Sequence, residues 1–327
     1  MKAIICTKYG LPDVLKLEEI QKPTPGDDEV LVEVHAASVT FSSVMGVTGE
    51  PFAGRLTGMG LLKPKQKIPG GDIAGRVEAV GRNVKQFQPG DEVFGDLSLG
   101  RGGYAEYVCA PKNALALKPA NILFAEAAAV PEAALVALQA LRDKGQIQPG
   151  QKVLIYGASG GIGTFAVQLA KYFGAEVTGV CSTRNLDMVR SIGADHVIDY
   201  TKEDFTKNGQ QYDLIVATAG YRSIFDYKRA LSSKGIYVAT GGSMAHIFQG
   251  LLIGPLISMT GSKKLGTMTV KPNKDLASMK ELIEAGKVKP IIDRRYPLSE
   301  AAEALTYYAE GHARGKVVIT VEHNNKT

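Results

Sequence analysis

Hydrophobic residues follow two different patterns along the chain. Up to about residue 122 they alternate with polar residues in short runs separated by Pro-Gly pairs, which is typical of half-buried strands in a compact barrel or sandwich. From residue 152 to residue 239, continuous apolar runs alternate with helical repeats, as in a parallel sheet covered by helices. This second pattern predicts strands at 152–156, 176–181, 196–199, 213–217 and 235–239, and helices at 162–173, 185–191 and 222–231. Residues 265–270 would add a sixth strand.

The end of the chain resumes the mixed character of its beginning. The pattern predicts helices at 274–285 and 300–310 and strands at 291–296 and 316–321. We therefore expect this tail to fold back on the first domain, so that the α/β segment is an insertion. The predicted parts are residues 1–122, residues 123–267 and a return segment of residues 268–327.

Residues 44–68 are less regular than the rest of the first domain. They are apolar, contain several glycines and end in a group of three lysines, Lys63, Lys65 and Lys67. A substrate lid, a helical dimer contact and a surface loop packed on its own side chains all fit this composition.

A glycine cluster follows the strand predicted at 152–156 and precedes the helix predicted at 162–173. Ala158, Gly160 and Gly163 occupy the three small-residue positions of the dinucleotide fingerprint. Small residues are needed because a Cβ at the turn would hold a diphosphate away from the N–H groups that begin the helix. The predicted cofactor contacts are Ala158, Ser159, Gly160, Gly161, Ile162 and Gly163. A tight strand–helix turn with nothing bound is the structural alternative.

The same stretch fits a second motif. Gly157-Ala158-Ser159-Gly160-Gly161 matches the G-x-S-x-G nucleophile elbow of serine hydrolases, for which His246 or His312 could supply the base. The elbow does not require Gly163, however, and it does not explain the polar residues after the next strand. The dinucleotide interpretation explains both.

Those polar residues favour NADPH over NADH. Ser182, Thr183, Arg184 and Asn185 follow the strand that ends at residue 181, and no carboxylate occurs before Asp187. A carboxylate would accept a hydrogen bond from the ribose 2′-hydroxyl of NADH, whereas hydroxyls and a guanidinium bind a 2′-phosphate. The alternative for Arg184 is a solvated residue at a helix start. Later strands end at Thr218, Gly241, Gly242 and Ser243, which we expect near the nicotinamide ribose.

Composition excludes several other classes of protein. The chain has 327 residues, of which 45% are hydrophobic and 22% charged, and no apolar run is long enough to cross a membrane. The mild net charge of +5 and the lack of an arginine-rich block argue against a nucleic-acid partner. The three scattered cysteines indicate a reducing compartment, and the five histidines do not pair at metal-ligand spacing. With no signal peptide at the N-terminus, we expect a cytoplasmic protein without a membrane partner.

A series of motifs resembles the medium-chain dehydrogenases/reductases. They are, in order, Gly70-Gly71-Asp72-Ile73-Ala74-Gly75-Arg76-Val77, Pro89-Gly90-Asp91-Glu92-Val93, Gly103-Tyr104-Ala105-Glu106-Tyr107, Ala158-Ser159-Gly160-Gly161-Ile162-Gly163 and Arg314-Gly315-Lys316-Val317-Val318. The resemblance is closest to the zinc-free quinone oxidoreductase branch, which includes zeta-crystallin and the alkenal/enone reductases. It implies an α/β fold class, with a Rossmann doubly wound parallel sheet plus a GroES-like β-barrel domain, and an active site in the cleft between them. It also implies a homodimer.

The positions that match the family's zinc ligands carry unsuitable residues. They are Thr40, Gly71-Asp72 and roughly Pro131, and the segment that would hold a structural zinc, residues 96–102, has no cysteine. Because Thr, Gly and Pro cannot supply thiolate or imidazole ligands, we predict that no zinc is bound. The quinone reductases usually carry Asn-Pro-Val where this chain has Thr40-Phe41-Ser42, so the acceptor is less well defined than the cofactor.

The resemblance implies NADPH-dependent hydride transfer to a small, apolar, planar acceptor, a quinone or an α,β-unsaturated carbonyl. An enone's developing enolate would gain from a hydrogen-bond donor, for which Thr40 and Tyr104 are candidates; a backbone-satisfied threonine and a core aromatic are the alternatives. Tyr200 resembles the family tyrosine beside the adenosine phosphate, and Lys316 the family lysine that approaches the cofactor, unless it is a plain surface lysine. An NADP-dependent alcohol/aldehyde reductase and an NADPH-binding structural or RNA-binding protein remain alternatives.

Overall fold

The computed structural model describes residues 1–52, 54–98, 102–242 and 244–323, and its contacts divide the chain into two compact units. The first comprises Met1–Leu135, Pro272–Gly286 and Pro290–Thr327, and the second comprises Val136–Lys271 and Lys287–Lys289. The short helix α2 (Phe124–Ala128) packs against strands β3 (Glu29–Val39) and β4 (Asp72–Val80) of the first unit. The structure therefore assigns α2 to the first unit, whereas the sequence pattern placed it with the second.

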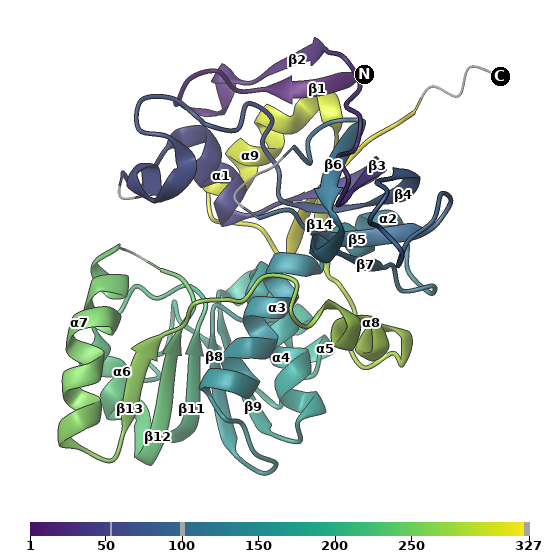
Figure 1. The fold of residues 1–327 in the computed structure, drawn as a ribbon. Coiled ribbons are helices and arrows are strands. Elements are labelled where there is room, and N and C mark those ends of the chain that lie inside the picture. The colour runs from purple at the N-terminus through teal and green to yellow at the C-terminus, as the bar shows by residue number, and fades with distance from the viewer. Residues whose placement is uncertain (53, 99–101, 243, 324–327) are drawn as a thin grey trace. The chain divides into compact units, whose positions relative to one another are not determined.

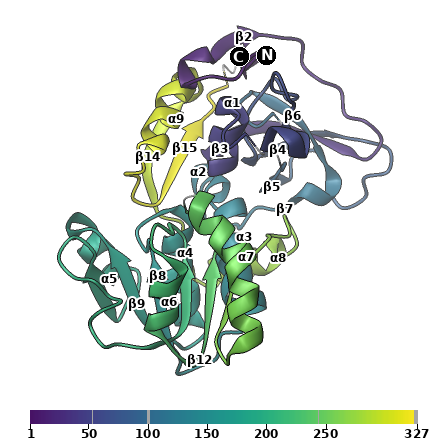
Figure 2. The same cartoon turned by 90° about the vertical axis from the view of Figure 1, so that its left-hand side faces the viewer.

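The second unit is built on a six-stranded parallel sheet (Figures 1 and 2). The strand order is β10 (His196–Asp199), β9 (Glu176–Cys181), β8 (Lys152–Tyr156), β11 (Tyr212–Ala217), β12 (Leu231–Ala239) and β13 (Lys264–Thr267). The apolar runs of β8 and β11 are completely buried, which is why these strands read as continuous hydrophobic segments. The predicted Rossmann-type sheet is confirmed.

Helices connect these strands in two series. α4 (Gly161–Tyr172) packs on β8 and β9, α5 (Leu186–Ser191) on β9 and β10, α6 (Ile224–Ala230) on β12, and α7 (Met244–Thr260) on β13. From β8 the chain proceeds to β9 and β10 on one side, and then returns to add β11, β12 and β13 on the other. The carboxyl ends of β8 and β11 therefore meet where the strand order reverses, which is where open α/β sheets bind ligands.

Helix α7 was not predicted from the sequence. Its residues, 244–260, include no Asp, Glu, Lys or Arg and contain Pro255, so the segment has no amphipathic period to mark it as a helix. Figure 1 shows it beside β13, at the edge of the sheet. Among the described residues, no helix is both long and apolar enough to cross a membrane.

The first unit contains a seven-stranded mixed sheet and a separate hairpin. The order is β14 (Ile292–Pro297), β15 (Lys316–Thr320), β3 (Glu29–Val39), β4 (Asp72–Val80), β5 (Glu92–Asp96) and β7 (Leu115–Leu117), with β6 (Tyr107–Pro111) also paired to β3. β1 (Lys2–Ile5) pairs with β2 (Lys16–Glu19). The helices are α1 (Phe41–Thr48), α2, α3 (Pro131–Gln139), which crosses into the second unit, α8 (Leu276–Glu284) and α9 (Ala301–Ala309).

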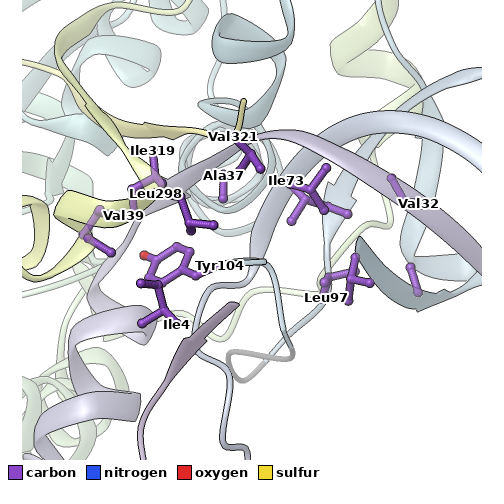
Figure 3. Packing of buried hydrophobic residues seen from close by; sticks show 14 of the residues in the cluster. Ile4, Val32, Ala37, Val39, Ile73, Leu97, Tyr104, Leu298, Ile319 and Val321 are labelled. Carbon is purple, nitrogen blue, oxygen red and sulfur yellow. The ribbon is translucent and has the colours of Figure 1, made fainter. Parts of the chain in front are cut away.

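Tyr104 lies in the hydrophobic core of this first unit. Figure 3 shows its ring beside Ile4, Val39 and Leu298, and its side chain is completely buried. Strands β3 and β15 contribute much of the same cluster, so residues from both ends of the chain form one core. The tail thus completes the first unit.

Candidate dinucleotide site

The glycine loop between β8 and α4 is a tight turn fixed by backbone hydrogen bonds. Gly157 has a φ of +84°, and its carbonyl oxygen accepts from the Gly160 N–H at 3.1 Å. The N–H groups of Gly157 and Ala158 both donate to the Val180 carbonyl oxygen of β9, at 3.1 and 3.0 Å. The loop is therefore held in place before any ligand binds.

The N-terminus of α4 presents N–H groups without a side-chain cap. Gly160 is the N-cap residue, and the first turn contains no acidic residue. The first N–H groups of a helix lack intrahelical acceptors and carry a partial positive charge. Since α4 has 12 residues, its start is suited to bind the diphosphate of a dinucleotide.

Gly160 and Gly163 differ in what surrounds them. A Cβ on Gly163 would lie 2.0 Å from the Gly157 carbonyl oxygen, so the turn itself requires glycine there. The closest protein atom to a Cβ on Gly160 would be that same oxygen, at 3.5 Å, an ordinary contact. The fold therefore tolerates a side chain at Gly160. A ligand that approaches the start of α4 explains glycine at this position.

Asn185 connects the glycine loop to the end of β9. Its Nδ2 donates to the Ser159 and Ser182 hydroxyl oxygens, each at 3.1 Å, and the residue is only 5% exposed. Its Oδ1 is buried and, within the part of the chain that the structure describes, has no hydrogen-bond partner. Three predicted cofactor contacts thus lie together, and one of them holds the other two in place.

A carboxylate that the sequence analysis missed lies beside these residues. Asp199 ends β10, in register with Cys181 at the end of β9. Its carboxylate accepts hydrogen bonds from the Thr183 and Thr201 hydroxyls, and these bonds lower the pKa of Asp199. The analysis searched for an acid only along the residues that directly follow β9. The predicted strand at 196–199 already placed Asp199 at the same sheet edge.

The remaining predicted contacts of the second unit also follow carboxyl ends of strands. Arg184 and Tyr200 are exposed, and the Tyr200 N–H donates to the Cys181 carbonyl oxygen at 3.1 Å. The Thr218 hydroxyl donates to the Tyr156 carbonyl oxygen at 3.0 Å. Gly241 and Gly242 follow β12, and Gly242 forms a bridge with Gly220. Ser243 lies outside the described residues.

The two predicted proton donors lie in the first unit and form hydrogen bonds there. The Thr40 hydroxyl oxygen accepts from the Ser43 N–H at 3.2 Å and caps α1, while the residue is only 3% exposed. The Tyr104 hydroxyl donates to the Ser38 carbonyl oxygen at 3.3 Å, and burial raises the pKa of Tyr104. Thr40 is thus a capping residue and Tyr104 a core aromatic, and their role as donors to a substrate stays a prediction.

Lys316 is not a surface lysine. Its side chain is 4% exposed, and its Nζ lies 3.5 Å from the Oδ2 of the fully buried Asp72. Asp72 also accepts from the Ser38 hydroxyl and the Glu132 N–H, each at 3.0 Å. Lys316 is therefore held by Asp72 inside the first unit.

The residues present do not suit a catalytic zinc. Among the described residues, no group of three His, Cys, Asp or Glu side chains could hold a metal ion. Asp72 is the one carboxylate at the positions matched to zinc ligands, and its oxygens already accept from protein donors. In the part of the chain that the structure describes, Asp72 thus belongs to no set of ligands of the kind that zinc prefers.

The serine hydrolase alternative also finds little support. The Ser159 hydroxyl is bonded to the Asn185 amide, which is neither an acid nor a base. A nucleophilic serine needs a general base within hydrogen-bond reach. His312 lies in the first unit, and the side chain of His246 is outside the described part.

Comparisons with known proteins agree with this geometry. The family described as alcohol dehydrogenase GroES-like domain matches residues 26–120, and the family described as zinc-binding dehydrogenase matches residues 192–319. A chloroplastic quinone oxidoreductase of Triphysaria versicolor is 35% identical over 98% of each chain. An NADPH-dependent alkenal/one oxidoreductase of Arabidopsis thaliana is 34% identical over 98% of this chain and 79% of its own length. The structure of the quinone oxidoreductase from Coxiella burnetii superposes with a TM-score of 0.87 at 30% identity, covering 98% of this chain and 99% of that one.

Proposed function

Because the chain belongs to the medium-chain dehydrogenase/reductase superfamily, in its quinone oxidoreductase branch, we propose that it transfers a hydride from NADPH to a quinone or an α,β-unsaturated carbonyl without a metal. Membership makes the protein an NAD(P)H oxidoreductase. The observation that carries the finer proposal is the uncapped start of α4 beside Gly160, which leaves room for a phosphorylated ligand. The acceptor and the choice of NADPH come from the arguments below.

The acceptor class is supported by the hydrogen bonds that Thr40 and Tyr104 make within the protein and by the names of two relatives. The nicotinamide supplies the hydride, so the protein has to align the reactants and exclude water. Thr40 and Tyr104 make hydrogen bonds within the protein, and a quinone can take its protons from solvent after reduction. The names of the two relatives reported above contain quinone and alkenal/one oxidoreductase.

The choice of NADPH depends on two groups of opposite charge. The exposed Arg184 guanidinium and the Ser182 hydroxyl favour a 2′-phosphate. The Asp199 carboxylate opposes it, because it repels a phosphate and engages the Thr183 hydroxyl. We propose that Arg184 dominates, since a guanidinium can bind a phosphate through two hydrogen bonds. Arg184→Glu should reverse the preference for NADPH over NADH, and an unchanged ratio of kcat/KM values would contradict this assignment.

One assay distinguishes the candidate reactions. NADPH consumption is measured with benzoquinone, phenanthrenequinone, an alkenal and a simple aldehyde. Turnover of the quinones or the alkenal supports the proposal. Turnover of the aldehyde alone would indicate an alcohol/aldehyde reductase. The chain is also similar to the structure of an NAD-dependent alcohol dehydrogenase (29% identity, TM-score 0.85), so this alternative is tested too. NADPH binding without any turnover would indicate a structural or RNA-binding role, for which filter binding to RNA is the direct test.

A homodimer is part of the proposal. Leu251, Leu252, Leu256 and Met259 are exposed on α7, beside the edge strand β13. An exposed apolar face of a helix is a surface that a second copy would cover. Leu252→Glu with Leu256→Glu should convert a dimer to a monomer in sedimentation velocity. A wild-type monomer would refute this part without affecting the reaction. A cytoplasmic location is likewise proposed from the sequence alone.

A further inference from the structure

Residues 60–67, which we call the leucine–lysine loop, present apolar and basic side chains together on the first unit. Leu62 is 88% exposed and Leu61 is 52% exposed, so two adjacent apolar side chains face solvent. Lys63, Lys65 and Lys67 follow them and are also exposed. Nothing in the proposed reaction uses these residues.

The loop is a defined structure that holds the leucines outward. The Tyr9 hydroxyl bonds to the carbonyl oxygens of Met59 and Gly60, at 2.9 and 2.6 Å. The Lys65 N–H donates to the Met59 carbonyl oxygen at 2.7 Å and so closes the loop. At the far end, the Cys6 N–H donates to the Lys67 carbonyl oxygen, also at 2.7 Å. Both ends are therefore fixed to the body of the first unit.

Gly60 makes the turn on which this geometry depends. Its φ is +104°, and a Cβ there would lie 2.3 Å from the Lys63 carbonyl oxygen. Pro64 is buried between exposed neighbours, so the loop packs inward at one residue while Leu61, Leu62 and the lysines face solvent. The exposure of the two leucines thus follows from the backbone.

The charge of this segment has one sign. Between Glu50 and Asp72 the sequence contains Arg55, Lys63, Lys65 and Lys67 and no acidic residue. Arg55 is engaged with the Gly49 carbonyl oxygen and with Glu50. The three lysines are not: within the part of the chain that the structure describes, none of their ammonium groups forms an ion pair.

We propose that the leucine–lysine loop docks the protein on an anionic lipid bilayer. Leu61 and Leu62 would enter the boundary between headgroups and acyl chains, and the three ammonium groups would face the lipid phosphates. Stable attachment to a membrane surface requires two signals, and an apolar anchor beside a basic cluster provides both. The sequence predicted no membrane partner because no segment can span a bilayer; docking on the surface of a bilayer does not require a span.

The observations favour a bilayer over the other anionic partners. A nucleic acid would call for arginines or aromatic rings to stack on bases, and residues 60–67 contain neither. An acidic protein would pair with the lysines but would leave the protruding Leu62 without a reason for its exposure. A bilayer accounts for both.

The test is sedimentation of the full-length protein with vesicles. Vesicles of phosphatidylcholine alone are compared with vesicles that also contain phosphatidylglycerol. We expect wild type to sediment with the anionic vesicles and to remain in solution with the neutral ones. Replacement of all three lysines by glutamine should lower the partition coefficient about a hundredfold, and Leu61→Ser with Leu62→Ser should lower it at least about tenfold.

Matched control variants distinguish binding by this loop from nonspecific adsorption of the protein to vesicles. Leu11→Ser with Leu123→Ser changes two leucines of similar exposure, 73% and 65%, at N-cap positions where serine is well tolerated. Lys202, Lys207 and Lys287, all exposed in the second unit, serve for a triple change to glutamine. Both controls should bind as wild type does, and thermal melting should show that every variant is folded.

The proposal fails if wild type does not sediment with anionic vesicles, or if the control variants lose as much binding as the loop variants. It also fails if soluble polyglutamate binds the wild type and the leucine variant equally well while the vesicles bind neither, because the loop would then be a site for acidic polypeptides. None of these results depends on the reaction that the enzyme catalyses.

Discussion

The Nζ of Lys316 lies 3.5 Å from the Oδ2 of Asp72 in the interior of the first unit, and both side chains are almost completely buried. Burial raises the pKa of Asp72 to about 8, while the ammonium of Lys316 acts in the opposite direction. A buried charge that loses its partner is strongly destabilising, because it is then neither solvated nor neutralised. The pair joins β15, from the end of the chain, to β4, from its beginning.

Lys316→Met should therefore destabilise the protein, and more so at high pH. Below its folded-state pKa, Asp72 takes up a proton and the lost ammonium matters less. In the unfolded chain the Asp72 carboxyl has its ordinary pKa of 3.8 and is ionised above it, while in the folded protein it stays protonated up to about pH 8. The free energy of unfolding therefore falls as pH rises toward about 8. Without Lys316 the fall continues to higher pH. We expect a loss of about 3–5 kcal/mol above pH 8, and less near pH 6.

Urea denaturation at several pH values measures this difference. The double variant Asp72→Asn with Lys316→Met has no carboxyl to titrate at this position, so its own free energy of unfolding should lack the fall with pH that Asp72 causes in wild type and in the single variant. If Lys316→Met lost the same free energy of unfolding at both ends of the pH range, Lys316 would not be the group that favours the ionised form of Asp72.

Gly160→Ala should weaken cofactor binding without harming the fold. The added Cβ meets only ordinary protein contact, so the melting temperature should stay close to that of wild type. The same methyl occupies the space at the start of α4, and we expect the dissociation constant for NADPH to rise at least about tenfold, which corresponds to about 1.4 kcal/mol. Isothermal titration calorimetry gives the affinity and differential scanning calorimetry the stability.

Gly163→Ala is the matched comparison. There the Cβ would lie 2.0 Å from a backbone oxygen, so the turn has to shift and the melting temperature should drop. Unchanged NADPH affinity in a stable Gly160→Ala protein would mean that no ligand occupies this space, and the dinucleotide assignment would have to be abandoned.

Asn185→Ala should loosen the glycine loop. Loss of the bonds to Ser159 and Ser182 leaves both hydroxyls without this donor, at a cost of about 1–2 kcal/mol in the free energy of unfolding. Because the loop is then less well fixed to β9, NADPH affinity should fall as well, by several-fold. Asn113→Ala changes an exposed asparagine that makes no side-chain hydrogen bond among the described residues, and it should change neither quantity. Equal effects of the two substitutions would show that Asn185 does not position the loop.

The sequence predicted the features that repeat and missed those that depend on register. The apolar runs of β8, β9 and β11 could be located because a strand buried on both faces must be hydrophobic along its length. The fingerprint around Gly160 and Gly163 could be located because the turn requires glycine at 163 and a bound diphosphate favours it at 160. Helix α7 could not, since an apolar segment without charged residues has no face to distinguish.

Pairings across the sheet were beyond the sequence for a related reason. Asn185 donates a hydrogen bond to Ser159, 26 positions away in the sequence, and the Thr183 hydroxyl donates one to Asp199, 16 positions away. Such contacts depend on which strand lies beside which, and no local pattern states that. Tyr104 shows the converse: a tyrosine in a strand-rich segment suits a core or a site equally well, and only its complete burial distinguishes them.

Asp199 provides a final prediction, because its ionised carboxylate lies at the sheet edge where the sequence analysis found only hydroxyls and a guanidinium. Asp199→Asn keeps an oxygen that accepts from Thr183 and Thr201 but removes the negative charge. The ratio of kcat/KM for NADPH to that for NADH should rise a few-fold, the size of an interaction between charges screened by water. Glu176→Gln makes the same change of charge at the opposite end of β9, where it should leave the ratio unchanged. A ratio that falls in Asp199→Asn would mean that this carboxylate helps to hold the phosphate-binding residues in place, and that its charge is not what limits the preference for NADPH.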